Sequence, residues 1–239
     1  MKQKLSILTS FILVLFIVSS CIFSGPSIKG NGNVKEETRS TGDFTEVKVS
    51  RGMNVYISNG ETTKVVVKAD ENLIDAIETE VVGDVLNVTV NKFIRQSKSL
   101  KVFVTVPNIE VIKTTSGSNV FSEDSLKTGN LEIKSSAGSN VRLSLEAGDL
   151  NVSASAGSNI FLDGSAKSLT MKANSGSNIK AGDLQAENCD VKVSSGANIW
   201  VKVQNGLTAK ASSGGNIWYS GQPGPLEIEK SSGGNVFKN

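Results

Sequence analysis

The chain contains no histidine among its 239 residues, and this absence excludes whole classes of enzyme. Pairs in which a histidine activates a serine or cysteine nucleophile cannot form, and the commonest metal ligand and general base of proteins is missing. Cysteine is almost as scarce, because only Cys21 and Cys189 occur, and no disulfide framework is expected. We therefore expect no catalysis, no metal and no cofactor.

An excess of charge is also lacking. Basic residues outnumber acidic ones only by the two lysines of the extreme N-terminus, Lys2 and Lys4, so the rest of the chain is neutral. Proteins that bind nucleic acid carry a basic face that attracts the phosphate backbone. We therefore expect no nucleic-acid partner.

The apolar run near the N-terminus, residues 5–18, is shorter than the roughly 20 residues that a membrane-spanning helix prefers. Two lysines precede it, and the sequence Val-Ser-Ser-Cys that ends at Cys21 resembles a bacterial lipobox. A transmembrane anchor is the alternative. We expect residues 1–20 to be a signal peptide and residues 21–42 to be a lipidated cysteine with a flexible tether, followed by an entry strand. The lipid would attach the chain to a membrane of the cell envelope, at the outer membrane, with the domain periplasmic or surface-exposed.

The chain does contain a repeated phrase: a small residue, glycine, a small residue, asparagine and a β-branched residue. Its first clear copy is Ser116–Val120, and the asparagines then recur at intervals of 18 to 21 residues. These asparagines are Asn119, Asn140, Asn159, Asn178, Asn198, Asn216 and Asn235. A fixed period near 19 residues is the mark of a repeat architecture.

Each repeat alternates in hydrophobicity with the period of two that a strand with one buried face requires. Leu131 and Ile133 flank Glu132, and the residue after every asparagine is valine or isoleucine. About 19 residues hold two strands and a corner but no crossover helix. We therefore predict an all-β fold, a right-handed parallel β-helix or β-solenoid with rungs of about 19 residues, over residues 108–239.

Residues 43–107 depart from this repeat and form a less regular β-rich half. The segments with strand patterns are 62–68, 84–91 and 100–106. Asp70, followed by apolar residues at helical spacing, predicts one short helix capped by that aspartate. We expect this half to cap the solenoid and to cover the edge that an open end would expose.

The corner residues predict a backbone conformation and a side-chain ladder. Glycine and asparagine adopt the left-handed conformation at the lowest cost, so we expect both to do so at the corners. One asparagine per rung also predicts a ladder of amides bonded along the axis. A phosphate-binding loop is not expected, because no helix follows these glycines.

The Gly-x-Asn-Val/Ile repeat, the β-rich half that begins near Phe44 and the lipobox together resemble the putative auto-transporter adhesin, head GIN domain family. The resemblance covers roughly residues 30–239. It implies a parallel β-helical fold, a location in the envelope of a diderm bacterium and a role in adhesion. It implies no catalytic residues.

Some parallel β-helices are polysaccharide lyases or hydrolases that use clustered carboxylates. Asp149, Asp163 and Asp183 lie near turns here, but at different distances from their asparagines, so we expect them not to align. The corners also lack the recurring aspartate of calcium-binding repeats. Cys189 occupies a column otherwise filled by leucine and is expected to be a buried small hydrophobe.

One outward column remains as a candidate for ligand binding. The residue two places after each asparagine is aromatic or basic, and Tyr56 holds the same place in an early copy of the repeat. With the tyrosine that follows the second tryptophan, the candidates are Phe121, Arg142, Phe161, Lys180, Trp200, Trp218, Tyr219 and Phe237. At about 4.8 Å per rung the row is roughly 30 Å long. Its flat rings are suited to stacking on sugars or anchoring a protein contact.

Two classes of function follow from this row. The first is a non-catalytic adhesin that binds a glycan or a protein along the solenoid. The second is a structural or assembly protein of the envelope, in which the row contacts a neighbouring subunit of an oligomer. A row covered by a tail or by the N-terminal half is the alternative to a binding site, because contiguous apolar rows are rarely left exposed.

Replacing Cys21 by serine tests the lipobox. The Cys21→Ser variant should lose lipid labelling and leave the membrane fraction, because serine offers no thiol for the lipid. Fractionation of metabolically labelled cells measures both effects. If the variant stays with the membrane, the apolar run is itself the anchor.

Overall fold

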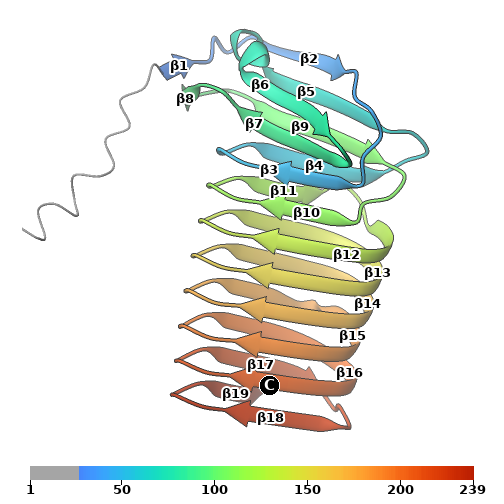
Figure 1. Cartoon of the computed structure of the whole chain (residues 1–239), viewed down its shortest axis with the longest axis vertical. Helices are drawn as coiled ribbons and strands as arrows, with labels where there is room; N and C mark the ends of the chain where they lie inside the picture. Colours follow the sequence, from blue (N-terminus) through green and yellow to red (C-terminus); the bar gives the residue numbers. More distant parts are fainter. Residues whose placement is uncertain (1–26) are drawn as a thin grey trace, which may run out of the picture.

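The computed structural model describes residues 27–239, so the expected signal peptide and lipidated Cys21 lie outside the described residues. Strands make up 67% of the described chain and helix 3%. The strands stack into a β-solenoid of about seven turns, with a less regular group of strands at one end (Figure 1). The predicted fold class is therefore confirmed.

The strands follow one another with one short helix among them. They are β1 Ser27–Lys29, β2 Val34–Arg39, β3 Glu46–Val49, β4 Asn54–Asn59, β5 Lys64–Asp70, the 3-10 helix η2 Glu71–Ala76, β6 Ile77–Val82, β7 Val85–Val90, β8 Phe93–Gln96, β9 Leu100–Val106, β10 Val111–Thr114, β11 Asn119–Ser122, β12 Leu126–Ser135, β13 Asn140–Ala154, β14 Asn159–Ala173, β15 Asn178–Val193, β16 Asn198–Ala211, β17 Asn216–Gly221, β18 Leu226–Lys230 and β19 Asn235–Lys238.

Each regular rung is one long strand with a bend in its middle. β14 pairs in parallel with β13 and β15 on both sides of its bend, so the solenoid has two faces (Figure 1). Ile160 and Leu162 line the core from one face, and Leu169 and Met171 line it from the other. Full burial of such a side chain stabilises the fold by about 1.5–3 kcal/mol. The repeated apolar columns thus form one continuous core along the axis.

Successive rungs are joined by a tight corner whose two central residues are both left-handed. At the corner before β15, φ is 52° at Ser175 and 68° at Gly176. Ser177 N–H closes the turn on the carbonyl of Asn174 at 3.2 Å. This is the geometry of a type I′ turn. Our expectation for asparagine was wrong, because Asn178 begins the extended strand and a serine, alanine or arginine is left-handed instead.

The corners bond to one another along the stack. Gly157 N–H donates to the carbonyl of Ser175 at 3.1 Å, and Gly176 N–H donates to that of Ser195 at 3.1 Å. A left-handed residue other than glycine costs about 1–2 kcal/mol. A hydrogen bond contributes about 0.5–1.5 kcal/mol net, so the stacked corners offset much of that cost. The strain is tolerable because it is repeated in register.

The asparagines at the strand starts form a ladder beside the corners. Each amide nitrogen donates to the side-chain oxygen of the asparagine one rung nearer the N-terminus, at 2.9–3.2 Å. The ladder begins at Asn54, whose own amide donates to the carbonyl of Leu100 at 3.0 Å. It ends at Asn235, so every bond in the ladder points the same way.

The N-terminal half covers one end of the stack. β3 and β4 form the first rung, pairing in parallel with β10 and β11 on one side and with β7 and β9 on the other. β2 then pairs antiparallel with β5, and β5 with β9. β1 and β2 lie in the range where we expected a flexible tether followed by an entry strand, so strands occupy more of this range than expected. The reason is that β5 offers a sheet edge with which β2 pairs.

The predicted short helix is the 3-10 helix η2, but Asp70 does not cap it. The side chain of Asp70 is 1% exposed and accepts N–H bonds from Gly32 at 2.9 Å, Lys98 at 3.0 Å and Ser99 at 2.9 Å. Burial alone would raise the pKa of Asp70, but these three donors and the charge of Lys98 lower it overall. Asp70 therefore ties the β1–β2 and β8–β9 loops to the end of β5.

The asparagine ladder predicts a position-dependent loss of stability. Asn178 bonds to a neighbour on each side, whereas Asn235 has a ladder neighbour only on one side. Asn178→Ala should lower the free energy of unfolding by about 1–3 kcal/mol, because it leaves a partner amide unsatisfied. Asn235→Ala should cost less than about 1 kcal/mol. Equal shifts in chemical denaturation would mean that each asparagine serves only its own corner.

Asp70 predicts a pH dependence of the capping half. Its folded pKa lies below the unfolded value, so its ionised form stabilises the fold above about pH 4 and that stability is lost as pH falls through the folded pKa. Asp70→Asn should therefore lower stability at pH 7 and flatten the decline in acid. Urea unfolding between neutral and acid pH measures both effects. The control is Asp75→Asn, because Asp75 is exposed. If the stability of this control falls as little in acid as that of Asp70→Asn, Asp70 does not have this role.

Candidate functional site

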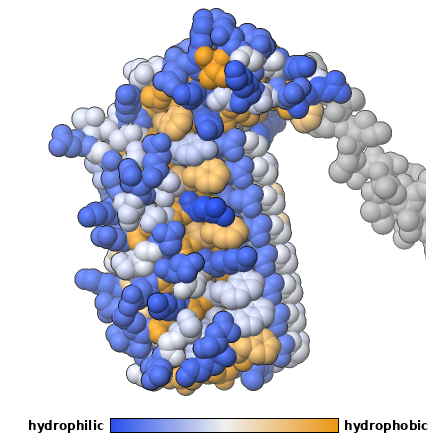
Figure 2. Space-filling view, turned by 180° about the vertical axis from the view of Figure 1, so that it is seen from behind, coloured by the Kyte–Doolittle hydropathy of each residue, from blue (hydrophilic) through white to orange (hydrophobic). Residues whose placement is uncertain are grey.

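A column of aromatic and basic side chains runs outward along one face of the solenoid. We call it the aromatic stripe. In spatial order it consists of Phe103, Tyr56, Phe121, Arg142, Phe161, Lys180, Trp200, Trp218 and Phe237. Figure 2 shows a column of rings on this face, interrupted by hydrophilic side chains. The stripe crosses β9, β4, β11, β13–β17 and β19, whose alternate residues point inward.

The side chains of the aromatic stripe contact one another face to face. The rings of Trp200 and Trp218 are stacked with centroids 4.7 Å apart and planes 7° apart, and Phe237 stacks on Trp218 at 5.5 Å. Tyr56 stacks between two phenylalanines at 5.1 Å each. The stripe is therefore a nearly continuous stack.

The two cations of the stripe belong to the same stack. The guanidinium carbon of Arg142 lies 4.9 Å from the ring centroid of Phe161, and Lys180 Nζ lies 5.3 Å from it. Lys180 Nζ also lies 5.6 Å from the ring of Trp200. Such cation–π contacts contribute about 0.5–1 kcal/mol at exposed sites. Both faces of Phe161 are thus occupied by cations.

This stacking changes what the stripe can bind. The faces of Phe161, Trp200 and Trp218 are occupied by their neighbours along the axis, so these rings turn their edges outward. The expectation that sugars stack flat on each ring is therefore wrong for the inner rings. A ring edge carries partial positive charge, and the stripe adds two cations. The exposed surface is suited to oxygen atoms and anionic groups of a partner.

Two residues of the stripe were assigned differently from sequence. Phe103 was missed, because only the structure shows that β9 stacks on β4 and places this ring on Tyr56. The sequence pattern that could have predicted its outward position is the alternation with Val102 and Val104, which are both buried. Tyr219 was included wrongly: it is only 5% exposed and pairs with the inward Val201. Adjacent residues of a strand point to opposite faces, so Tyr219 belongs to the core.

Polar columns flank the aromatic stripe on both sides. The asparagine ladder runs two residues before it. Two or three residues after it, on the other side, the outward residues are Ser58, Ser144, Asp163, Asp183, Lys202 and Ser220. Hydrogen-bonding groups therefore accompany the ring edges over much of the length of the stripe.

The sequence also misplaced one pair of aspartates. Asp163 and Asp183 are register partners, because a bulge in β15 absorbs the extra residue between them. Asp149 instead lies after the bend of β13, where its register partner on β14 is Ser168. Within residues 27–239, no group of three or more metal-ligating side chains is found. The aligned aspartates are thus part of the polar flank.

Cys189 does not offer a nucleophile. Its side chain is buried, and this burial raises the pKa of its thiol to about 12. The thiolate is the reactive form of cysteine, so Cys189 is unreactive at neutral pH. This agrees with its predicted place in a leucine column.

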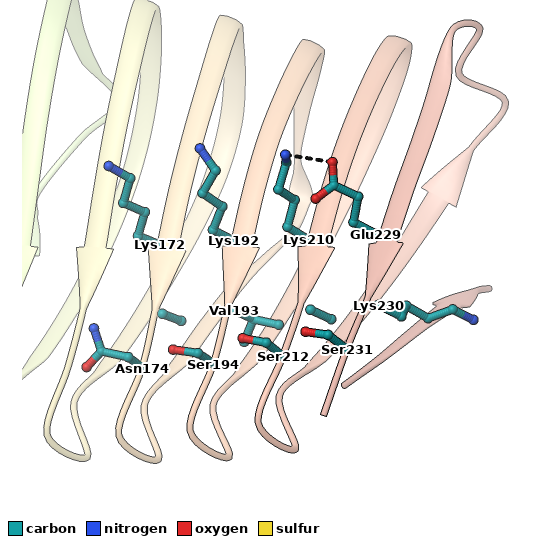
Figure 3. Close-up of a pocket in the computed structure, with 12 residues that line it drawn as sticks. Lys172, Asn174, Lys192, Val193, Ser194, Lys210, Ser212, Glu229, Lys230 and Ser231 are labelled. Carbon is teal, nitrogen blue, oxygen red and sulfur yellow. Dashed lines mark hydrogen bonds and ion pairs between the residues drawn. The ribbon is translucent and has the colours of Figure 1, made fainter. Parts of the chain in front are cut away.

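A shallow groove of about 490 Å³ lies on the other face of the solenoid, formed by the second halves of the long strands. Figure 3 shows the residues that line it. Lys172, Lys192 and Lys210 line one side of it on successive rungs. Lys192 pairs with Asp190 at 3.2 Å, and Lys210 with Glu229 at 2.7 Å. The Glu229 carboxylate raises the pKa of Lys210 by its hydrogen bond and its charge. Two of the four lysines that line the groove are thus paired with carboxylates. The stripe, which runs along the whole solenoid, is the stronger candidate site.

Comparison with solved structures identifies three close relatives in fold. A putative adhesin from Bacteroides fragilis NCTC 9343 has a TM-score of 0.83 and 22% identity, over 89% of this chain and 100% of that chain. A putative adhesin from Parabacteroides merdae ATCC 43184 has a TM-score of 0.75 and 19% identity, over 90% and 100%. A putative lipid binding protein from Parabacteroides distasonis ATCC 8503 has a TM-score of 0.70 and 19% identity, over 90% and 100%. At these identities the likeness shows a common fold.

Two further observations concern membrane segments and family. In the part of the chain that the structure describes, no helix has the length and apolar character to cross a membrane. No curated protein sequence matches the chain significantly. The family model described as putative auto-transporter adhesin, head GIN domain, matches residues 43–223, which include the first rung, the capping strands β5–β9 and most of the solenoid. The chain therefore belongs to the putative auto-transporter adhesin, head GIN domain family.

Proposed function

We propose that the chain is a non-catalytic, lipid-anchored adhesin of the cell envelope that binds a glycan or a protein along the aromatic stripe. Family membership supports the adhesive role and the surface or envelope location. The lipobox at Cys21 supports the anchor. The absence of histidine and the unreactive Cys189 favour binding over catalysis.

The observation that carries the proposal is the continuity of the stripe across nine strands. At about 4.8 Å per step it is roughly 40 Å long, which suits an extended partner. Its ring edges, with Arg142 and Lys180, attract oxygen atoms, and the polar flanks supply donors and acceptors. A linear glycan rich in hydroxyl or carboxylate groups matches this surface well, and a polar protein segment is the other partner class.

The assembly alternative is favoured by a separate observation at the C-terminal end. Leu226 and Ile228 of β18 and Phe237 of β19 are 42%, 40% and 44% exposed. Among the strands of residues 27–239, β18 pairs only with β16 and β19 only with β17, and an edge without a partner strand is a template for another chain. This observation favours end-to-end association. Molecular mass in solution as a function of concentration distinguishes association from a monomer with a binding stripe.

Replacing both tryptophans tests the adhesive function. Trp200→Val with Trp218→Val should abolish binding in a glycan and matrix-protein screen with residues 22–239, because two adjacent ring edges are removed. Valine keeps the strand propensity of the site. The lost stacking should cost about 1–3 kcal/mol of stability and leave the protein folded.

The matched control is Lys192→Gln on the opposite face, which should bind as the unmodified protein does. Cooperative loss of folding in the tryptophan variant would show that the rings are core. If the tryptophan variant is folded and binds every ligand as the unmodified protein does, the stripe is not the adhesive site.

A further inference from the structure

A second groove, of about 800 Å³, lies beside the capping half rather than on the solenoid shaft. Its walls are the corner residues Arg51 and Ser116, the end of β7, the strand β8 and Leu100 at the start of β9. Neither the aromatic stripe nor the lysine-lined groove includes any of these residues. The proposed adhesive function makes no use of it.

The groove combines apolar and basic side chains without an acidic one. Phe93 is 51% exposed at its edge, and Ile94 and Leu100 contribute apolar surface. Arg51, Lys92 and Arg95 are its charged residues, and no aspartate or glutamate lines it. This composition is typical of surfaces that contact an anionic headgroup and the hydrocarbon beneath it.

Lys92 and Arg95 are available to a partner, whereas Arg51 is held by a hydrogen bond to the backbone. Among the ion pairs of residues 27–239, none involves Arg51, Lys92 or Arg95. Residues 88–101 as a whole contain two further lysines and no acid, whereas the rest of residues 22–239 holds 19 basic and 23 acidic side chains. The basic charge of the capping half is thus concentrated at β8 and its flanks.

The groove is held in a fixed shape. Arg51 occupies the left-handed position of its corner, where other rungs have serine or alanine, and its Nη1 donates to the Val90 carbonyl at 2.9 Å. Asp70 accepts the N–H groups of Lys98 and Ser99 directly after β8. β8 also pairs with β1. A preformed groove loses less entropy on binding than a loop would.

The groove lies where the chain approaches the proposed anchor. The described chain begins at Ser27, which pairs with Phe93 of β8. Cys21 is six residues earlier in the sequence, and six residues span at most about 20 Å. A lipid on Cys21 would therefore keep β8 within about that distance of the membrane surface. This step depends on the lipid anchor in the proposed function.

We propose that the groove around Phe93, Lys92 and Arg95 docks the capping half on anionic lipids of the membrane that holds the anchor. The cations bind lipid headgroups and Phe93 enters the interface. Docking sets the orientation of the solenoid. It also adds a second attachment to the anchor at Cys21.

The test uses residues 22–239, which lack Cys21 but contain the whole described fold. The vesicle test therefore measures docking without the lipid anchor, and its result does not depend on whether the aromatic stripe binds an adhesion partner. The protein is sedimented with vesicles of phosphatidylcholine alone and with vesicles containing about one-third phosphatidylglycerol. It should bind the anionic vesicles, and binding should weaken with added salt because the attraction is screened.

The decisive variant is Lys92→Gln with Arg95→Gln. At about 1 kcal/mol per basic residue near an anionic surface, partitioning should fall by more than about tenfold. Phe93→Ser should reduce it several-fold without changing the charge. The matched control, Lys172→Gln with Lys202→Gln, removes the same charge from exposed positions on the shaft and should keep most of the binding.

Three results would overturn the proposal. The first is the absence of binding to anionic vesicles. The second is an equal loss of vesicle binding in Lys172→Gln with Lys202→Gln, which would mean that binding depends only on the net charge of the protein. The third is displacement by inorganic phosphate at constant ionic strength, which would make the groove a phosphate site.

Discussion

Parallel stacking in register is the constraint on which the rest of this structure depends. Each rung places a residue on the same kind of residue in the next rung, so every column must tolerate its own repetition. Apolar columns form the core, asparagines bond amide to amide, and aromatic rings stack face to face. The left-handed corner is acceptable for the same reason, because its strain is offset by the bond to the next corner. The strands thus determine the chemistry of both faces.

The same stacking also determines what the site offers. Rings that contact each other along the axis cannot also present their faces to a ligand, so the surface of the aromatic stripe consists of ring edges and cations. The basic groove at β8 has a different origin: it lies where the regular repeat gives way to capping strands. The proposed adhesive and membrane-facing surfaces therefore occupy different parts of the molecule.

Sequence periodicity predicted much of this structure and failed where the period was broken. The solenoid, its rung length, the capping half and the outward column of rings followed from columns of like residues. Phe103 was missed because β9 contacts β4 only through the fold, and the alignment of Asp163 with Asp183 depends on a bulge. The left-handed serines and alanines, and the covered ring faces, are three-dimensional properties that no spacing encodes. Tyr219 was an avoidable error, since alternation alone places it inward.

The one-way asparagine ladder has a consequence for how such proteins vary in size. Because every amide donates toward the N-terminus, the donor end is always closed by the Leu100 carbonyl of the capping half and the acceptor end is always left at the last rung. An internal duplication or deletion of one rung therefore leaves the bonding at both ends intact. It changes the reach of the molecule by one strand spacing, about 4.8 Å. The gene of such a protein can lengthen or shorten its shaft in fixed increments while the capping half stays the same.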